Sequence, residues 1–212
     1  MLMLFYNAKN KFTPLLQNVI KNRLLMEKIV KVLKNIAPLT EEDIVNFLGI
    51  TKIRQLEKGN WWIEDGKKNR KIGFLESGYL RKYYLKEGKE ITDYFYFEND
   101  FTADLPSILS NTGPVASIIA MQKSSLVTFS YDDFNKLCKV SPRLEHLQRL
   151  IIEKTFLSFY NRAVSFIMET PKERYDRLIS ARPDILQRVA QYHVASYLGI
   201  SPQHLSRIRA KK

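Results

Sequence analysis

The sequence is poor in the residues that disulfides, metal centres and membrane spans require. Cys138 is the only cysteine among 212 residues, which excludes an intrachain disulfide, a cysteine-ligated iron–sulfur cluster and a cysteine-rich zinc site. No apolar run approaches the roughly 20 residues of a membrane span. Lys9 and Lys11 interrupt the early apolar stretch that a signal peptide would need. These absences favour a cytoplasmic protein without a membrane partner.

Signatures of catalysis are also missing. His146, His193 and His204 have no second histidine or cysteine at a metal-ligand spacing. The sequence contains no phosphate-cradling glycine loop, nucleophile elbow or paired-carboxylate signature. The acidic run Glu41–Asp43 is explained by the favourable electrostatics of a helix start. We therefore expect no enzyme, no catalytic residues, no metal site and no cofactor.

Acidic residues are absent from one end of the chain and scarce at the other. Residues 1–25 contain four basic and no acidic residues, and residues 170–212 contain nine basic and three acidic residues. Most of the net charge of +12 is therefore concentrated at the two ends. A basic surface neutralises phosphates, and binding of that kind weakens as salt rises. The alternative is a solvated basic face without a partner.

The last 20 or so residues have the spacing of a helix-turn-helix, a motif that places a helix in the major groove of DNA. Val194 and Leu198 are four apart, on the inner face of a first helix. The small Ala195 leaves room for a second helix to cross closely. Gly199 stands where the first helix must end, and glycine adopts the left-handed conformation there without penalty.

The expected second helix begins after Ser201, whose hydroxyl can cap it, with Pro202 in its first turn. Leu205 and Ile208 are spaced to pack back on the first helix. The outward positions carry donors and acceptors suited to base edges and phosphates. The predicted DNA-binding residues are Ser201, Pro202, Gln203, His204, Ser206, Arg207, Arg209 and Lys211. An ordinary pair of packed helices joined by a glycine is the alternative.

Upstream, the pattern predicts a β-rich domain followed by one long helix. Between residues 50 and 130, short β-like runs alternate with turn signals such as Asp65-Gly66 and Ser77-Gly78. The predicted runs are residues 61–63, 72–75, 79–85, 91–97, 117–120 and 126–129. This texture favours a sandwich or barrel. Residues 142–169 read as a helix whose apolar stripe is too wide for one domain, so part of it should meet another subunit. Thr170 and Glu173 form a capping box that starts a new helix and marks a domain boundary.

This order of parts resembles the Crp/Fnr family of bacterial transcription regulators over residues 26–212. The segments that carry the resemblance are Lys58-Gly59, Glu64–Gly66, Phe74–Gly78, Gly88–Ile91, Thr170–Tyr175 and Gln191–Arg209. The terminal Ser-Arg-Ile-Arg is similar to the branch found in Bacteroidetes-like bacteria.

The resemblance implies an α+β fold in four parts. Residues 26–135 would form an antiparallel β-roll sensor domain of the cyclic nucleotide-binding type, and residues 136–169 a dimerisation helix. Residues 170–212 would form the helix-turn-helix domain. Residues 1–25 are an N-terminal extension, either an extra helix or sequence upstream of a working start at Met26.

The resemblance also implies a function, that of a dimeric, sequence-specific regulator of transcription. Its partners would be a palindromic DNA operator, a second copy of the chain and RNA polymerase. By the family pattern, Pro202, Gln203, Ser206 and Arg207 face the bases, and Arg207 is best placed for guanine. Pro202 departs from the family's common arginine, so the preferred DNA sequence cannot be carried over.

The sensor half departs further from the family. Members that bind cyclic AMP hold its phosphate with a Gly-Glu pair and an arginine followed by a small polar residue. The matching segments here are Phe101–Leu109 and Gly113–Ile119, and no lysine or arginine occurs between Asp100 and Gln122. Burying a phosphodiester without a cation or amide donors is costly, and Asp104 would repel it. We therefore expect no cyclic AMP site of that kind.

Two interpretations of the roll remain open. Asp104, Ser107 and Ser117 could line a pocket for another effector, or the roll could be filled by its own side chains. The alternative function is that of a small-molecule-binding protein, of the cyclic nucleotide type, in which DNA binding is weak or lost.

Overall fold

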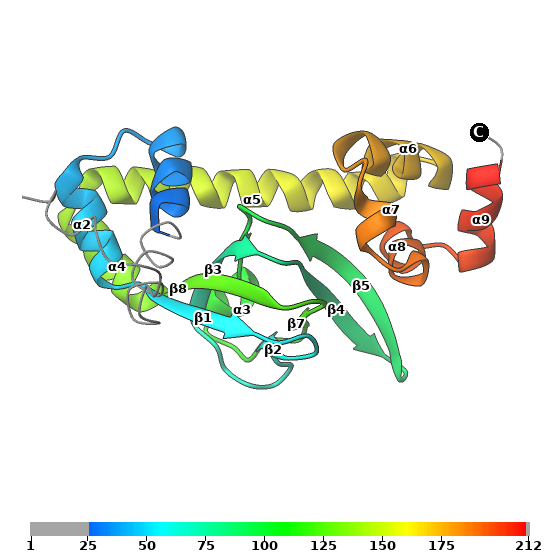
Figure 1. Cartoon of the computed structure of the whole chain (residues 1–212), viewed down its shortest axis with the longest axis horizontal. Coiled ribbons are helices and arrows are strands. Elements are labelled where there is room, and N and C mark those ends of the chain that lie inside the picture. Colours follow the sequence, from blue (N-terminus) through cyan, green and yellow to red (C-terminus); the bar gives the residue numbers. More distant parts are fainter. Residues whose placement is uncertain (1–25, 211–212) are drawn as a thin grey trace, which may run out of the picture.

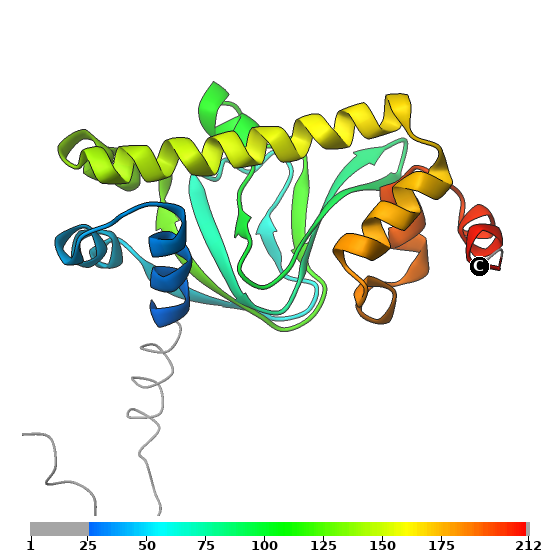
Figure 2. The same cartoon turned by 90° about the horizontal axis from the view of Figure 1, so that it is seen from above.

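The computed structural model describes residues 26–210, so the predicted extension 1–25 and Lys211 lie outside it. Its longest element is α5 (Pro142–Met168), a helix of 27 residues that runs along most of the molecule (Figure 1). A β-roll lies beside the middle of this helix, and helical layers lie at both ends (Figure 2). The predicted α+β fold and the predicted long helix are confirmed.

Within residues 26–210, the strands form two four-stranded sheets in which every pairing is antiparallel. In chain order the strands are β1 (Lys52–Leu56), β2 (Trp61–Ile63), β3 (Lys71–Ser77), β4 (Leu80–Lys86), β5 (Lys89–Tyr96), β6 (Phe101–Thr102), β7 (Ser117–Ala120) and β8 (Ser124–Ser130). One sheet has the order β1-β8-β3-β6 and the other β2-β7-β4-β5. The sequence pattern located six of these strands but missed β1, β6 and the short helix α3 (Leu105–Ser110).

The turn between β3 and β4 requires glycine. Gly78 has a φ of +96°, and an added Cβ would lie 2.8 Å from the backbone oxygen of Lys123. Any other residue would be both strained and in collision with β8. Inside the roll, large side chains fill the space between the sheets, among them Trp62, Leu75 and Leu126, each at most 2% exposed.

The N-terminal end packs on the outer face of the β1-β8-β3-β6 sheet. Residues 26–36 are helical, α2 (Glu41–Gly49) begins with a cap at Thr40, and α4 (Tyr131–Val140) is capped by Ser130. Phe47, Phe129 and Phe134 meet edge to face in this layer, with ring centroids 5.1–5.8 Å apart. Aromatic pairs of this geometry stabilise a core beyond their area burial.

The C-terminal end consists of α6 (Pro171–Ala181), α7 (Ile185–Arg188), α8 (Gln191–Leu198) and α9 (Pro202–Ala210). The predicted capping box at Thr170 and Glu173 is present. These helices do not stand apart from the roll, because Tyr79, Phe95 and Phe97 of the β4–β5 region share a core with Val194 and other buried residues of the helices. No helix within residues 26–210 combines the length and apolar character needed to cross a membrane.

Candidate nucleic-acid interface and effector region

Helices α8 and α9 have the predicted helix-turn-helix geometry. Gly199 ends α8 in the left-handed conformation with a φ of 70°, and its N–H donates to carbonyl oxygens of α8. The Ser201 hydroxyl accepts from the backbone N–H of His204 at 3.2 Å, which caps α9. Leu198 and Leu205 are at most 1% exposed, so the inner faces of the two helices close on each other as expected.

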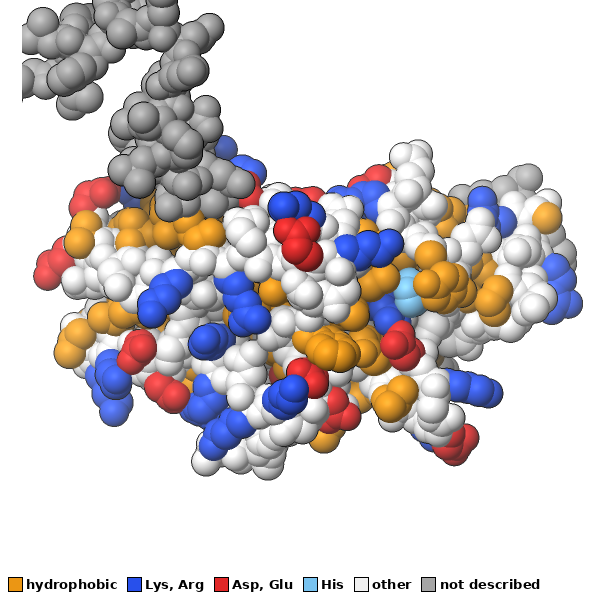
Figure 3. Space-filling model, turned by 60° about the horizontal axis from the view of Figure 1, so that its bottom comes forward, with side chains coloured by type: hydrophobic (Ala, Val, Ile, Leu, Met, Phe, Trp, Pro, Cys, Tyr) orange, Lys and Arg blue, Asp and Glu red, His pale blue; other side chains and the backbone are white. Residues whose placement is uncertain are grey.

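The outer face of α9 lies free at the far end of the molecule (Figure 1). Of the predicted DNA-binding residues, His204 is half-buried and the other described ones are exposed: Ser201, Pro202, Gln203, Ser206, Arg207 and Arg209. In Figure 3, Lys and Arg side chains are spread over the roll and also lie at the end formed by the C-terminal helices. Basic side chains are therefore not confined to α9.

Arg207 and Arg209 differ from the preceding Arg177, Arg182 and Arg188, each of which has an acidic partner. Within the described residues, neither has an acidic side chain within 4.0 Å. By contrast, Arg188 pairs with Glu98 at 2.7 Å and 2.9 Å, and Arg177 lies 3.2 Å from Glu169. The two guanidinium groups on α9 thus keep their donors available for another molecule.

Arg174 of α6 fixes the position of the helix-turn-helix relative to α5. Arg174 is buried and donates to the carbonyl of Leu198 at 3.1 Å and 3.2 Å, and to the carbonyl of Glu169 at 2.6 Å. It therefore ties the end of α8 to the end of α5. The sequence does not indicate this role, because an arginine inside an amphipathic helix carries no signal that its partners are distant carbonyls.

The roll also holds the motif, through β5 and the loop that follows it. The Ser196 hydroxyl accepts from the backbone N–H of Thr92 at 2.9 Å. Burial raises the pKa of Glu98, but the hydrogen bonds from Arg188 and from backbone N–H groups, together with the charge of Arg188, outweigh it, so that the pKa is lowered and the pair stays charged. His193 of α8 is 6% exposed. Burial, with a smaller contribution from Arg81, lowers the pKa of His193 to about 4, so this histidine is neutral at pH 7.

The predicted effector residues lie near a buried cation, Lys82, that the sequence does not place in this region. Lys82 of β4 is 1% exposed, and its Nζ lies 3.2 Å from a carboxylate oxygen of Asp104 and 3.6 Å from one of Asp93. Burial lowers the pKa of Lys82, but the interactions with Tyr84, Asp104 and Asp93 together raise it by more. The net pKa is above the usual value, so the ammonium stays charged. The negative charge of Asp104, which should repel a phosphate, is thus already paired with Lys82.

The three predicted effector residues are all buried, with exposed fractions of 3–7%. Asp104 is 3% exposed beside Lys82. The Ser107 hydroxyl donates to the backbone carbonyl of Asp104 at 2.9 Å. The Ser117 hydroxyl accepts from the backbone N–H of Asp65 at 3.1 Å. All three take part in internal contacts, and their role toward a ligand stays a prediction. No group of three His, Cys, Asp or Glu residues within 26–210 is arranged to hold a metal ion.

Comparison with known proteins identifies the roll. Residues 53–141 match the family model of the cyclic nucleotide-binding domain. A search of curated proteins finds no match.

Solved structures match the chain well beyond the roll. A CooA mutant from Carboxydothermus hydrogenoformans has a TM-score of 0.63 and 15% identity, covering 83% of this chain and 85% of that chain. The c-di-GMP responsive global regulator CLP of Xanthomonas campestris has a TM-score of 0.62 and 15% identity, covering 81% and 91%. The Catabolite Activator Protein of Thermus thermophilus has a TM-score of 0.53 and 18% identity, covering 85% of each chain.

These matches define the class and the architecture. The chain contains a domain of the cyclic nucleotide-binding fold. The roll, the long helix and the C-terminal helices together have the fold of the Crp/Fnr regulators, as the sequence resemblance predicted. The finer likeness to a Bacteroidetes-like branch stays a prediction.

Proposed function

We propose that this protein is a sequence-specific DNA-binding regulator of transcription. Helix α9 of each subunit would enter the major groove of one half of a palindromic operator. The observation that carries the proposal is the exposed outer face of α9, where Arg207 and Arg209 have no acidic partner among the described residues. The fold shared with known regulators supports it. The protein would act in the cytoplasm, with RNA polymerase as a further partner.

A homodimer follows from the surface of α5. Its exposed apolar side chains include Phe156, Leu157 and Tyr160, which are 64%, 55% and 56% exposed, and Ile167, which is 80% exposed. The Phe156 and Tyr160 rings stack on each other with centroids 6.2 Å apart. A contiguous apolar face of this kind is unusual on a monomer and marks an interaction surface. We propose that the α5 helices of two subunits pack along it.

Replacing Leu157 with aspartate should weaken self-association about 100-fold, because a charge replaces apolar surface that the seam would bury in both subunits. Sedimentation equilibrium measures the change. The control Leu85→Asp alters an apolar residue of β4 that is 62% exposed, and we expect it to leave the dimer intact. A Leu157→Asp protein that remains fully dimeric would contradict the proposed seam.

Selection of bound sequences from random DNA, followed by mapping of bound sites across the source genome, tests the proposed function directly. We expect enrichment of a palindrome whose half-sites are about one helical turn apart. Affinity should fall steeply as salt rises, because phosphate contacts release counterions. Enrichment of no sequence over background at low salt would rule out a sequence-specific regulator.

The family match of the roll favours one other function, the binding of a cyclic nucleotide. The contacts near the predicted site oppose it, because Lys82, the buried cation there, is already paired with Asp104 and Asp93 and is not free to hold a phosphate. We expect calorimetry with cyclic AMP and cyclic GMP to show no tight binding. Micromolar or tighter binding of either would instead favour the small-molecule-binding alternative.

A further inference from the structure

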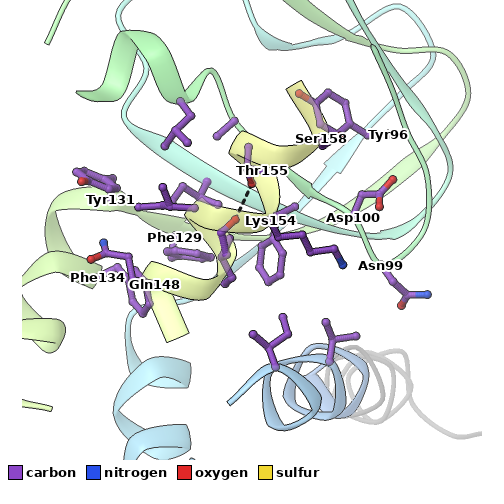
Figure 4. A pocket seen from close by; sticks show the side chains of 18 of the residues that line it. Tyr96, Asn99, Asp100, Phe129, Tyr131, Phe134, Gln148, Lys154, Thr155 and Ser158 are labelled. Atoms are coloured by element: carbon purple, nitrogen blue, oxygen red, sulfur yellow. Dashed lines mark hydrogen bonds between the residues drawn. The ribbon is translucent and has the colours of Figure 1, made fainter. Parts of the chain in front are cut away.

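A cavity of about 220 Å³ opens between α5, the helix of residues 26–36 and the roll (Figure 4). Neither Lys82 nor Asp104 lines it, and the ring of Phe159, whose centroid lies 5.6 Å from the Lys82 Nζ, forms part of the wall. Its walls come from distant parts of the chain and are largely apolar and aromatic. They include Ile36, Ile72, Phe101, Phe129, Ile151 and Phe159.

Several polar groups in the wall are already bonded within the protein. The Thr155 hydroxyl donates to the carbonyl of Ile151 at 2.8 Å, and the Gln148 amide donates to Asn135 at 2.7 Å. Asp100 accepts from the backbone N–H of Phe97 at 2.8 Å. The other charged group is Lys154, whose side chain is exposed. One carboxylate and one ammonium leave the wall without net charge, so it gives no advantage to an ionic ligand.

The volume sets the size of the ligand. An apolar cavity of ~150 Å³ holds one benzene molecule, so this cavity has room for two fused rings. We propose that it binds an uncharged, largely apolar molecule of about ten to twelve non-hydrogen atoms. The walls exclude cyclic nucleotides on two grounds, since a phosphodiester would find no buried cation there and a nucleotide is too large.

The position of the cavity gives its occupancy a consequence, which rests on the proposed function. Asn99 and Asp100 of the β5–β6 loop line the cavity, and Glu98 of the same loop pairs with Arg188 beside the helix-turn-helix. Asn99 has a φ of 73°, so the loop already has a backbone conformation that side chains rarely adopt. A ligand that shifts this loop would also shift the support of α8 and α9.

Titration with 2-naphthol, an uncharged two-ring compound with one hydroxyl, tests the site by the fluorescence of the probe. We expect saturable binding of one molecule per subunit by the full chain without DNA. Ala103→Phe and Ser158→Phe each place a ring into the cavity and should weaken binding about tenfold or more. The control Leu109→Phe enlarges a residue of α3 that is 55% exposed and lies outside the lining, and it should leave binding unchanged.

Absence of saturable binding would overturn the proposed site, and so would binding that neither substitution weakens. Two filling variants are used so that misfolding of one, detected by circular dichroism, leaves the other as the test. Because the probe is titrated without DNA, failure here leaves the DNA-binding proposal standing. Conversely, if the protein did not bind DNA specifically, saturable binding of 2-naphthol would still show that the cavity holds a ligand.

Discussion

Replacing Arg207 with alanine is expected to abolish specific operator binding while the fold and the dimer remain intact. The side chain is exposed on α9 and has no acidic partner within the described residues, so its removal costs no folded-state contact of that kind. A forked guanidinium that bonds both acceptors of guanine contributes ~1–3 kcal/mol. Two subunits would lose about 2–6 kcal/mol together, which is roughly 30-fold to more than 10,000-fold in affinity.

Fluorescence anisotropy with the selected operator, at one fixed salt concentration, measures this loss. Arg54→Ala is the matched control, because Arg54 is an exposed arginine of β1 in the roll and lies far along the chain from α9. We expect Arg54→Ala to bind the operator as the unaltered protein does. If Arg207→Ala retained the original affinity for the operator, α9 would not be the recognition helix.

Replacing Lys82 with methionine should destabilise the protein by about 3–5 kcal/mol, the usual cost of removing one partner of a buried ion pair. Asp104 would remain buried at 3% exposure without its cation. Asp93 would be less affected, since Arg162 also lies 3.5 Å from it. Urea denaturation followed by circular dichroism measures the free energy of unfolding.

A double substitution separates the ion pair from simple packing. Lys82→Met combined with Asp104→Leu removes both charges and should recover most of the lost stability, because an apolar pair of similar volume often replaces a buried ion pair without cost. Lys123→Met is the control, since its exposed pair with Glu57 should contribute within about 0.5 kcal/mol. A double variant no more stable than Lys82→Met would show that the charges are not the reason for the cost.

The elements that the sequence predicted correctly depend on neighbouring residues. The cap at Thr170, the stop at Gly199 and the start at Ser201 are each settled within about one helical turn. The strands that were found have apolar runs bounded by turn signals. β6 was missed because it is only two residues long, and β1 because Leu56 is the one buried residue among its five.

The outer face of α9 was predicted for the same local reason. A helix whose inner positions, Leu205 and Ile208, are buried must present the residues between them outward. The sequence alone therefore determined the helix-turn-helix, the long helix and the polar surface that the proposed function uses. It also determined that a phosphate-binding arginine is missing between Asp100 and Gln122.

Only the tertiary structure decided what surrounds these elements. Lys82 meets Asp104 because β4 and the end of β6 close over the same interior, and Arg188 meets Glu98 across 90 positions of sequence. The cavity is assembled from strands, a loop and four helices that no local pattern connects. Burial and pairing between distant segments depend on how sheets and helices pack, and sequence periodicity specifies which face is buried but not which partner covers it.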